Sequence, residues 1–247
     1  MSAGDTHSPR RSAVVFGARN LGHAVIEALR TEGWAVAGVA RSADTLQGIR
    51  AAGALALEAD VTDPAAVHGV LERVAAAHGR VDLAVNAASP HGGDRSGPFG
   101  GGPLAQAPPG AFDAWTAAPA RGAFAFLSAG ARFALAQGGP ATLIQITGGS
   151  ARRAIAGRGA WAAGSFAVRA LTNAAALELR PHGVHVALLI VDAGIEPRSG
   201  APGGGAALDA LADPRELAGA VRFLAEQGAR AATHELVVTP LAESWTP

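Results

Sequence analysis

Residues 13–24 read Ala-Val-Val-Phe-Gly-Ala-Arg-Asn-Leu-Gly-His-Ala, and this stretch decides the fold. Four apolar residues, typical of a buried strand, run directly into Gly17. An amphipathic helical pattern follows from Leu21 to Thr31. A glycine turn between a strand and a helix lets the backbone approach a pyrophosphate at the positively polarised helix N-terminus. The alternative is an ordinary tight turn, so the rest of the chain has to decide between the two.

The same alternation of short apolar runs and helical patterns continues through the chain. Six strand–helix repeats and a final strand predict an α/β fold, a single doubly wound Rossmann-type domain. Its parallel seven-stranded sheet would carry helices on both faces, with the ligand site at the C-terminal ends of the strands. The strands are expected at 13–16, 35–40, 54–58, 81–85, 141–147, 184–191 and 235–239.

The chain has no linker that divides it into two domains. We expect a flexible tail over residues 1–11 and one domain over 12–247, with Gly/Pro-rich loops near 91–110 and 197–205. A loop as long as the first one is usually functional or disordered. Two helices, 111–118 and 120–137, are expected after it, separated by Pro119.

Composition excludes several kinds of chemistry and partner. The 20 basic and 20 acidic residues balance, so nothing favours nucleic acid or an anionic membrane as a partner. The sequence holds no Cys, Tyr or Lys, which excludes thiol chemistry, a Schiff-base or P-loop lysine and a tyrosine acid. His182 and His185 have metal-like spacing, but they flank a turn without a nearby carboxylate, which favours a surface turn. The longest aliphatic run, 186–191, is too short to span a bilayer, and we expect a cytoplasmic protein.

Two further strand ends carry polar groups that suit a nucleotide. Asp60-Val61 closes the third strand, where a carboxylate can accept a hydrogen bond from an adenine amine. Asn86-Ala87-Ala88 closes the fourth strand. With these residues the chain resembles the short-chain dehydrogenase/reductase family over nearly its full length. The resemblance includes the segment Trp161-Ala-Ala-Gly-Ser and the ending His234-Glu-Leu-Val-Val.

The resemblance implies a nicotinamide cofactor and a departure in the glycine motif. The family has three glycines there; Gly17 and Gly22 match the outer two, the segment is one residue shorter, and the middle glycine is missing. We expect Asn20 to supply a left-handed conformation nearby.

Charge predicts which nicotinamide cofactor the site prefers. The second strand ends Ala40-Arg41-Ser42 without an acid, and Arg19 lies in the glycine turn. Guanidinium groups suit a 2′-phosphate, so NADP(H) is favoured over NAD(H). The expected cofactor-binding residues are Gly17, Arg19, Asn20, Leu21, Gly22, Arg41, Ser42, Asp60, Val61, Asn86, Ala87 and Ala88.

All four catalytic positions implied by the resemblance are changed. The family uses a Ser, a Tyr thirteen residues later, a Lys four beyond the Tyr, and an Asn in an earlier helix. Gly148, Trp161, Ser165 and Pro119 stand at these positions. Indole cannot relay a proton near neutral pH, so Trp161 is interpreted as a wall of a substrate pocket that includes Gly148 and Ser165.

Other residues are candidates to replace the lost proton carriers. Ser150 and Thr147 flank the matching serine position, Asp192 follows the sixth strand, and His91 opens the first glycine-rich loop. Each could equally be a cap, a turn residue or a solvated side chain. We take Ser150, Asp192 and His91 as the catalytic candidates.

Three functions remain open at this point. The first is an atypical NADP(H)-binding enzyme of this family, acting on a small, mostly apolar carbonyl or alcohol without the Tyr/Lys relay. The second is a non-redox enzyme for a cyclisation, elimination or isomerisation. The third is a catalytically silent nucleotide-binding protein. The resemblance also implies a homodimer or homotetramer, paired through helices 120–137 and 161–180, whose composition is mostly apolar.

Overall fold

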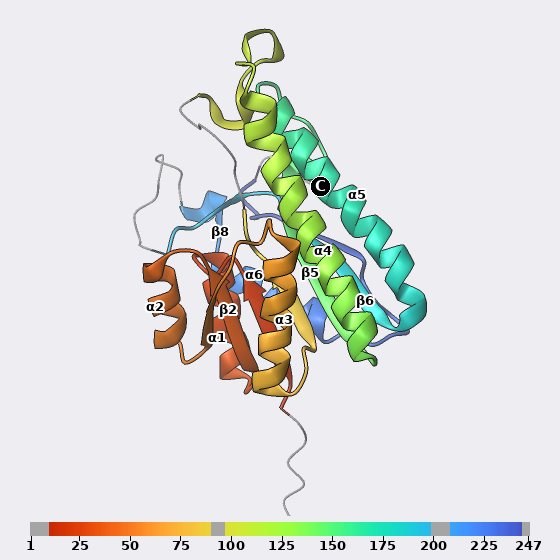
Figure 1. Cartoon of the computed structure of the whole chain (residues 1–247). Coiled ribbons are helices and arrows are strands. Elements are labelled where there is room, and N and C mark those ends of the chain that lie inside the picture. Colours follow the sequence, from red (N-terminus) through yellow and green to blue (C-terminus); the bar gives the residue numbers. More distant parts are fainter. Residues whose placement is uncertain (1–9, 90–96, 199–207, 244–247) are drawn as a thin grey trace, which may run out of the picture.

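A computed structural model describes residues 10–89, 97–198 and 208–243. Seven strands form one parallel sheet in the order β3-β2-β1-β4-β5-β6-β9 (Figure 1). The order reverses direction between β1 and β4, which is the place where open α/β sheets bind ligands. The strands are β1 Ser12–Phe16, β2 Ala35–Ala40, β3 Leu55–Glu58, β4 Leu83–Asn86, β5 Ala141–Gly148, β6 Val184–Val191 and β9 Glu235–Val238.

Helices cover both faces of this sheet. The apolar layer on one face includes side chains of α1 Leu21–Thr31, α2 Ala43–Ala51 and α6 Pro214–Ala225. The layer on the other face includes α3 Pro64–His78, α4 Ala118–Gln137 and α5 Gly159–Leu179 (Figure 1). The predicted doubly wound Rossmann-type fold is confirmed.

Local sequence explains these elements. In β1, Ala13 and Val15 pack into one layer while Val14 and Phe16 pack into the other, as strand alternation requires. The start of α3 is explained in the same way: the Asp63 side chain accepts a hydrogen bond from a backbone N–H of the first turn, and a proline opens the helix.

The expected break at Pro119 is wrong. A π-helical turn, Asp113–Ala117, runs directly into α4, and Pro119 is the second residue of that helix. A proline removes one N–H from a helix and crowds the carbonyl four residues earlier, and a wider π-helical turn at that place relieves both effects.

Short elements lie within the first expected loop and on either side of the second. Residues 97–110 of the first Gly/Pro-rich segment include two 3₁₀ turns, Phe99–Gly101 and Leu104–Gln106. A small parallel sheet joins β7 Gly194–Ile195 to β8 Leu211–Ala212. These pieces are too short to show a hydrophobic period. Residues 1–9 and 199–205, from the expected tail and second loop, lie outside the described residues. Within the described ranges, no helix has the length and apolar character needed to cross a membrane.

Candidate functional site

A cavity of about 520 Å³ opens at the C-terminal ends of the central strands, at the predicted place. Its wall is built from the glycine turn, the ends of β1, β2, β4, β5 and β6, and the facing sides of α4 and α5. Eleven of the expected cofactor residues line it together with the three expected pocket residues: Gly17, Arg19, Asn20, Leu21, Arg41, Ser42, Asp60, Val61, Asn86, Ala87 and Ala88, with Gly148, Trp161 and Ser165.

Both matched glycines are required by close backbone contacts. Gly17 has φ +82°, and a Cβ there would lie 2.6 Å from the carbonyl carbon of Ala87 and closer still to the backbone of Ala88. Gly22 is not on the cavity wall. A Cβ at Gly22 would lie 2.6 Å from the carbonyl oxygen of Gly17, so this glycine lets α1 start directly against the turn.

The expectation of a left-handed Asn20 is wrong. Asn20 has φ −122° and ψ −93°, and all described residues with positive φ are glycines. Its side chain does something else: Nδ2 donates a hydrogen bond of 3.0 Å to the carbonyl oxygen of Glu196. The extra conformational freedom of the missing glycine is therefore not reproduced, and Asn20 instead joins the glycine turn to the segment after β6.

The Asp60 carboxylate closes the β3 end of the cavity. Its Oδ1 accepts hydrogen bonds from the Thr62 backbone N–H at 2.9 Å and from the Thr62 hydroxyl at 2.8 Å. Its Oδ2 accepts from the Arg41 guanidinium at 3.2 Å. The pKa of Asp60 is lowered, mainly by the hydrogen bond from the Thr62 N–H and further by the Thr62 hydroxyl and Arg41. The carboxyl group therefore stays ionised at neutral pH. Sequence reasoning missed the contact with Arg41.

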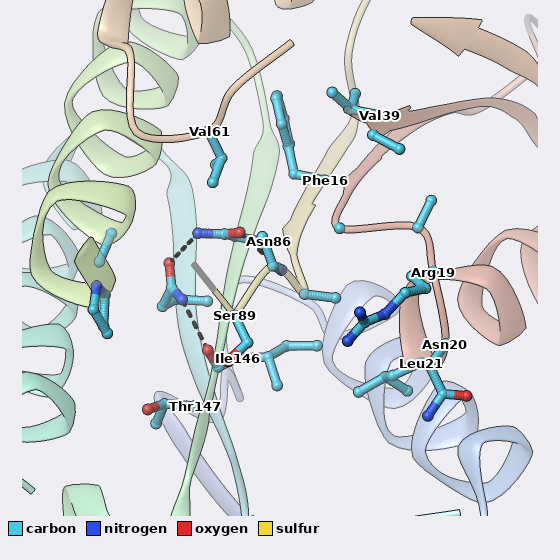
Figure 2. Close-up of a pocket in the computed structure, with 18 of the residues that line it drawn as sticks. Phe16, Arg19, Asn20, Leu21, Val39, Val61, Asn86, Ser89, Ile146 and Thr147 are labelled. Atoms are coloured by element: carbon cyan, nitrogen blue, oxygen red, sulfur yellow. Dashed lines mark hydrogen bonds between the residues drawn. The ribbon is translucent and has the colours of Figure 1, made fainter. Parts of the chain in front are cut away.

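A buried amide pair forms the floor of the cavity. Asn86 Nδ2 donates to Gln145 Oε1 at 2.9 Å, and Gln145 Nε2 donates to the carbonyl oxygen of Ile146 (Figure 2). Asn86 Oδ1 in turn accepts from the Ala88 N–H at 3.2 Å. The pair therefore fixes the backbone that packs against Gly17. Gln145 was not predicted, although a polar residue inside the apolar strand β5 is a signal that could have found it.

Two arginines face the nucleotide end of the cavity. Arg19 extends from the glycine turn with its guanidinium turned toward the middle of the cavity (Figure 2). Arg41 lies at the end of β2, and its side chain is 63% exposed beside Asp60. An exposed ion pair of this kind is weak, so Arg41 remains available to a phosphate.

The four positions that the family resemblance assigns to catalysis lie together on the wall of the same cavity. Gly148, Trp161, Ser165 and Pro119 all line it. The Ser165 hydroxyl donates to the Trp161 carbonyl oxygen at 3.0 Å, within its own helix. A Cβ at Gly148 would meet only the Val191 carbonyl oxygen, at 3.9 Å, so there is room for a side chain.

Trp161 belongs to an aromatic cluster. Its ring lies 5.5 Å from Phe99 and 5.9 Å from Trp115, and Phe99 lies 4.9 Å from Trp115 (centroid distances). Edge-to-face contacts at these distances stabilise a fixed ring orientation. Trp161 is thus held as a rigid part of the cavity wall.

Two of the three catalytic candidates, Ser150 and Asp192, are not on the cavity wall. Asp192 accepts from the Arg153 guanidinium at 3.2 and 3.4 Å and fills the space where a side chain at Gly149 would stand. Ser150 is buried nearby, and neither residue is on the cavity wall. His91 lies outside the described residues. Of the two hydroxyl residues beside Gly148, Thr147 lines the cavity and Ser150 does not (Figure 2).

Of the two histidines with the i, i+3 spacing, His185 has a structural contact. His185 Nε2 lies 2.9 Å from the Thr233 carbonyl oxygen. Among the described side chains, no group of three or more His, Asp or Glu is arranged to hold a metal ion.

The sheet order, the glycine turn and the cavity at the switch point together define a Rossmann-type nucleotide-binding protein. The family model described as short chain dehydrogenase matches residues 11–194, and the chain belongs to this family. No curated protein sequence matches the chain.

Solved structures with the same fold cover nearly the whole chain. An alcohol dehydrogenase from the archaeon Thermococcus sibiricus, complexed with 5-hydroxy-NADP, is 23% identical over 96% of this chain and 100% of its own, with a TM-score of 0.77. A metagenomic short-chain oxidoreductase in complex with NADP is 29% identical over 94% and 98%, with a TM-score of 0.71. Acetoin dehydrogenase from Enterobacter cloacae is 22% identical over 98% and 100%, with a TM-score of 0.77.

Proposed function

We propose that the chain binds NADP(H) and acts on a small, mostly apolar carbonyl or alcohol compound without a Tyr/Lys proton relay. The observation that carries this proposal is one continuous cavity. Its nucleotide end keeps the glycine turn and cationic side chains, while its other end is walled by Gly148, Trp161 and Ser165. The second half of the proposal follows from the sequence, which contains neither Tyr nor Lys.

The residues present fit a nicotinamide dinucleotide. Gly17 lets the turn pack against the backbone of Ala87 and Ala88, and the turn leads into the N-terminus of α1, which favours a pyrophosphate. Arg19 and Arg41 would hold a 2′-phosphate, and Asp60-Val61 would border the adenine. Two of the similar structures were solved with NADP or a modified NADP, which supports the choice.

A bound nicotinamide would supply the hydride chemistry. The chain's own residues have a positioning part in the reaction: the rigid Trp161 excludes water from one side, and the Asn86–Gln145 pair keeps the cavity floor in place. At this end, the described wall presents the hydroxyls of Thr147 and Ser165 and no histidine or carboxylate. The proton would therefore come from water, which the Thr147 hydroxyl would orient by a hydrogen bond.

The cofactor preference is testable by calorimetric titration. We expect the protein to bind NADPH more tightly than NADH, and Arg41→Ala to weaken NADPH by about 1.5–3 kcal/mol, the range for hydrogen bonds to charged groups. NADH should lose much less. Equal affinities for the two cofactors, or an unchanged NADPH affinity in the variant, would contradict the proposed preference for NADP(H).

A nucleotide-binding protein without redox turnover is the second candidate. It is favoured by the Ser165 hydroxyl, which is turned into its own helix, and by the indole at the position of the acid. A non-redox reaction, such as an elimination or isomerisation, would use the same cavity. Nucleotide binding with no change in nicotinamide absorbance in the presence of carbonyl compounds would favour these alternatives.

We also propose a homodimer or homotetramer built on α4 and α5. Phe124 of α4 is 56% exposed, and Phe166 and Leu177 of α5 are 43% and 69% exposed. Exposed apolar side chains gathered on neighbouring helices are typical of an interface.

Light scattering at micromolar concentration tests this assembly. The wild type is expected at a dimer or tetramer mass, and Phe166→Glu is expected to shift it toward the monomer because a charge would be buried in the interface. Phe223→Glu is the matched control, since Phe223 is 54% exposed on α6. A wild-type monomer mass would contradict the proposal.

A further inference from the structure

The segment after β6 crosses the nucleotide end of the cavity. Ala193 and Ile195 line the wall there. One residue further on, the Glu196 carbonyl accepts the hydrogen bond from Asn20 Nδ2. Asn20 stands where the chain differs from the three-glycine motif, and its side chain holds this segment in place through that hydrogen bond.

Beyond this anchor, the Arg198 side chain lies close to Gly48 of α2 and His23 of α1. Its Nη1 is 3.3 Å from the position that a Cβ on Gly48 would take, and the His23 ring carbon Cε1 is 3.7 Å from the same point. The absent side chain at Gly48 therefore leaves the room that the guanidinium occupies. Burial, and next the charge of Arg198, lower the pKa of His23, as expected for a cation close to α1.

The face of α2 that Arg198 contacts also carries a residue of the cavity wall. Gly48 lies three residues after Thr45, so both share one face of α2. Thr45 lines the cavity and receives a hydrogen bond of 2.8 Å from the Ser42 hydroxyl. Arg198 is thus one helical turn from the Ser42–Thr45 hydroxyls at the end of β2.

The charges near the end of β2 favour an anion. In residues 10–89, 97–198 and 208–243, neither Arg19 nor Arg198 has a carboxylate within ion-pairing distance, and Arg41 has only the exposed pair with Asp60. The acid nearest in sequence, Glu196, interacts electrostatically with Arg215. Arg19 and Arg41 therefore line the cavity, Arg198 lies against α2 one helical turn beyond its wall, and Asp60 is in direct contact with Arg41.

We propose that Arg198 determines specificity for the 2′-phosphate of NADP(H), as a third cation beside Arg19 and Arg41. Asn20 is a positioning residue that holds the segment carrying Arg198. The inference rests on the proposed function, because it assigns a residue to the phosphate end of that same cavity. It also assigns a role to the departure in the glycine motif.

Calorimetric titration with nucleotide fragments tests the inference without any turnover. The probes are 2′,5′-ADP and 5′-AMP, which differ by the 2′-phosphate, followed by NADPH and NADH. Arg198→Gln is expected to weaken 2′,5′-ADP and NADPH roughly five- to tenfold, between the effects of an exposed ion pair and of a charged hydrogen bond. Binding of 5′-AMP and NADH should remain nearly unchanged.

Two more variants test whether the loss of affinity depends on the position of Arg198 or only on the net charge of the protein. Arg50→Gln removes an exposed cation near the far end of α2 and should leave all four affinities unchanged. Asn20→Ala should weaken 2′,5′-ADP and NADPH in the same direction as Arg198→Gln, because Arg198 loses its anchor.

The outcomes separate a failure of the inference from a failure of the proposed function. A loss of 2′,5′-ADP and NADPH affinity confined to Arg198→Gln and Asn20→Ala supports the inference. Equal weakening of NADH and NADPH would assign Arg198 to the pyrophosphate and overturn it, as would unchanged affinities. If the wild type binds none of the four probes, the proposed function itself fails.

Discussion

Alanine in place of Gly17 is expected to lower the free energy of unfolding by about 2–5 kcal/mol and to abolish nucleotide binding. Two effects add. The backbone at Gly17 has φ +82°, which costs about 1–2 kcal/mol for a residue with a Cβ. The new methyl group would also overlap the backbone of Ala87 and Ala88, so the β4 end has to move away from the turn.

The matched control for this prediction is Gly33→Ala. Gly33 has φ +84° but open surroundings, where a Cβ would meet nothing within 4 Å, so only the conformational cost of about 1–2 kcal/mol applies. Urea unfolding and calorimetry with NADPH measure both properties. If the two variants are equally stable and both bind nucleotide, the close contact of Gly17 with the Ala87–Ala88 backbone contributes nothing to stability or binding.

The other large effect concerns the proton relay that the proposed function does without. Generic ketones and alcohols should show negligible NADPH-linked turnover with the wild type, and Trp161→Tyr alone should help little. An unassisted phenol keeps a pKa near 10, and Gly148 has no hydroxyl to orient a carbonyl. The triple change Gly148→Ser, Trp161→Tyr and Ser165→Lys should raise turnover by about 10²–10⁴, the range for general acid–base catalysis.

The cavity has room for this triple variant. A serine fits at Gly148, where the nearest atom to a Cβ is 3.9 Å away, and positions 161 and 165 both border the cavity. Pro119 still stands at the Asn position, which sets the upper limit of the gain. The matched control replaces Trp161 by Phe in the same triple background, since it lacks only the phenol oxygen. Wild-type reduction that survives Trp161→Phe, measured by nicotinamide absorbance, would reveal a relay that does not need these positions.

The fold could be predicted because its signal is repeated along the chain. The period of strands such as Val184–Val191, and caps such as Asp63, are local properties that survive packing. The continuity of the helix through Pro119 could not be predicted, because a proline usually ends a helix and the sequence carries no recognisable signal of the π-helical turn that precedes it. Strands of two residues, such as Gly194–Ile195, have no period to recognise.

The site could be predicted where position along the chain fixes position in space. Residues directly after parallel strands, such as Asp60 and Asn86, necessarily meet at one edge of the sheet, and they line the cavity. Side-chain direction is not fixed in this way. Asp192 follows β6 as expected, but Arg153 holds its carboxylate away from the cavity. Arg198 reaches α2 through a path that the sequence does not specify.

The contact between Gly149 and Asp192 has a consequence for evolution and for library design. The Asp192 carboxyl group occupies the volume that any side chain at position 149 would need. The two positions are therefore coupled: a larger residue at 149 becomes acceptable only after the acid at 192 has been exchanged for a smaller group. Related sequences should show correlated exchanges at this pair, and random libraries that vary one position alone should be depleted of folded members.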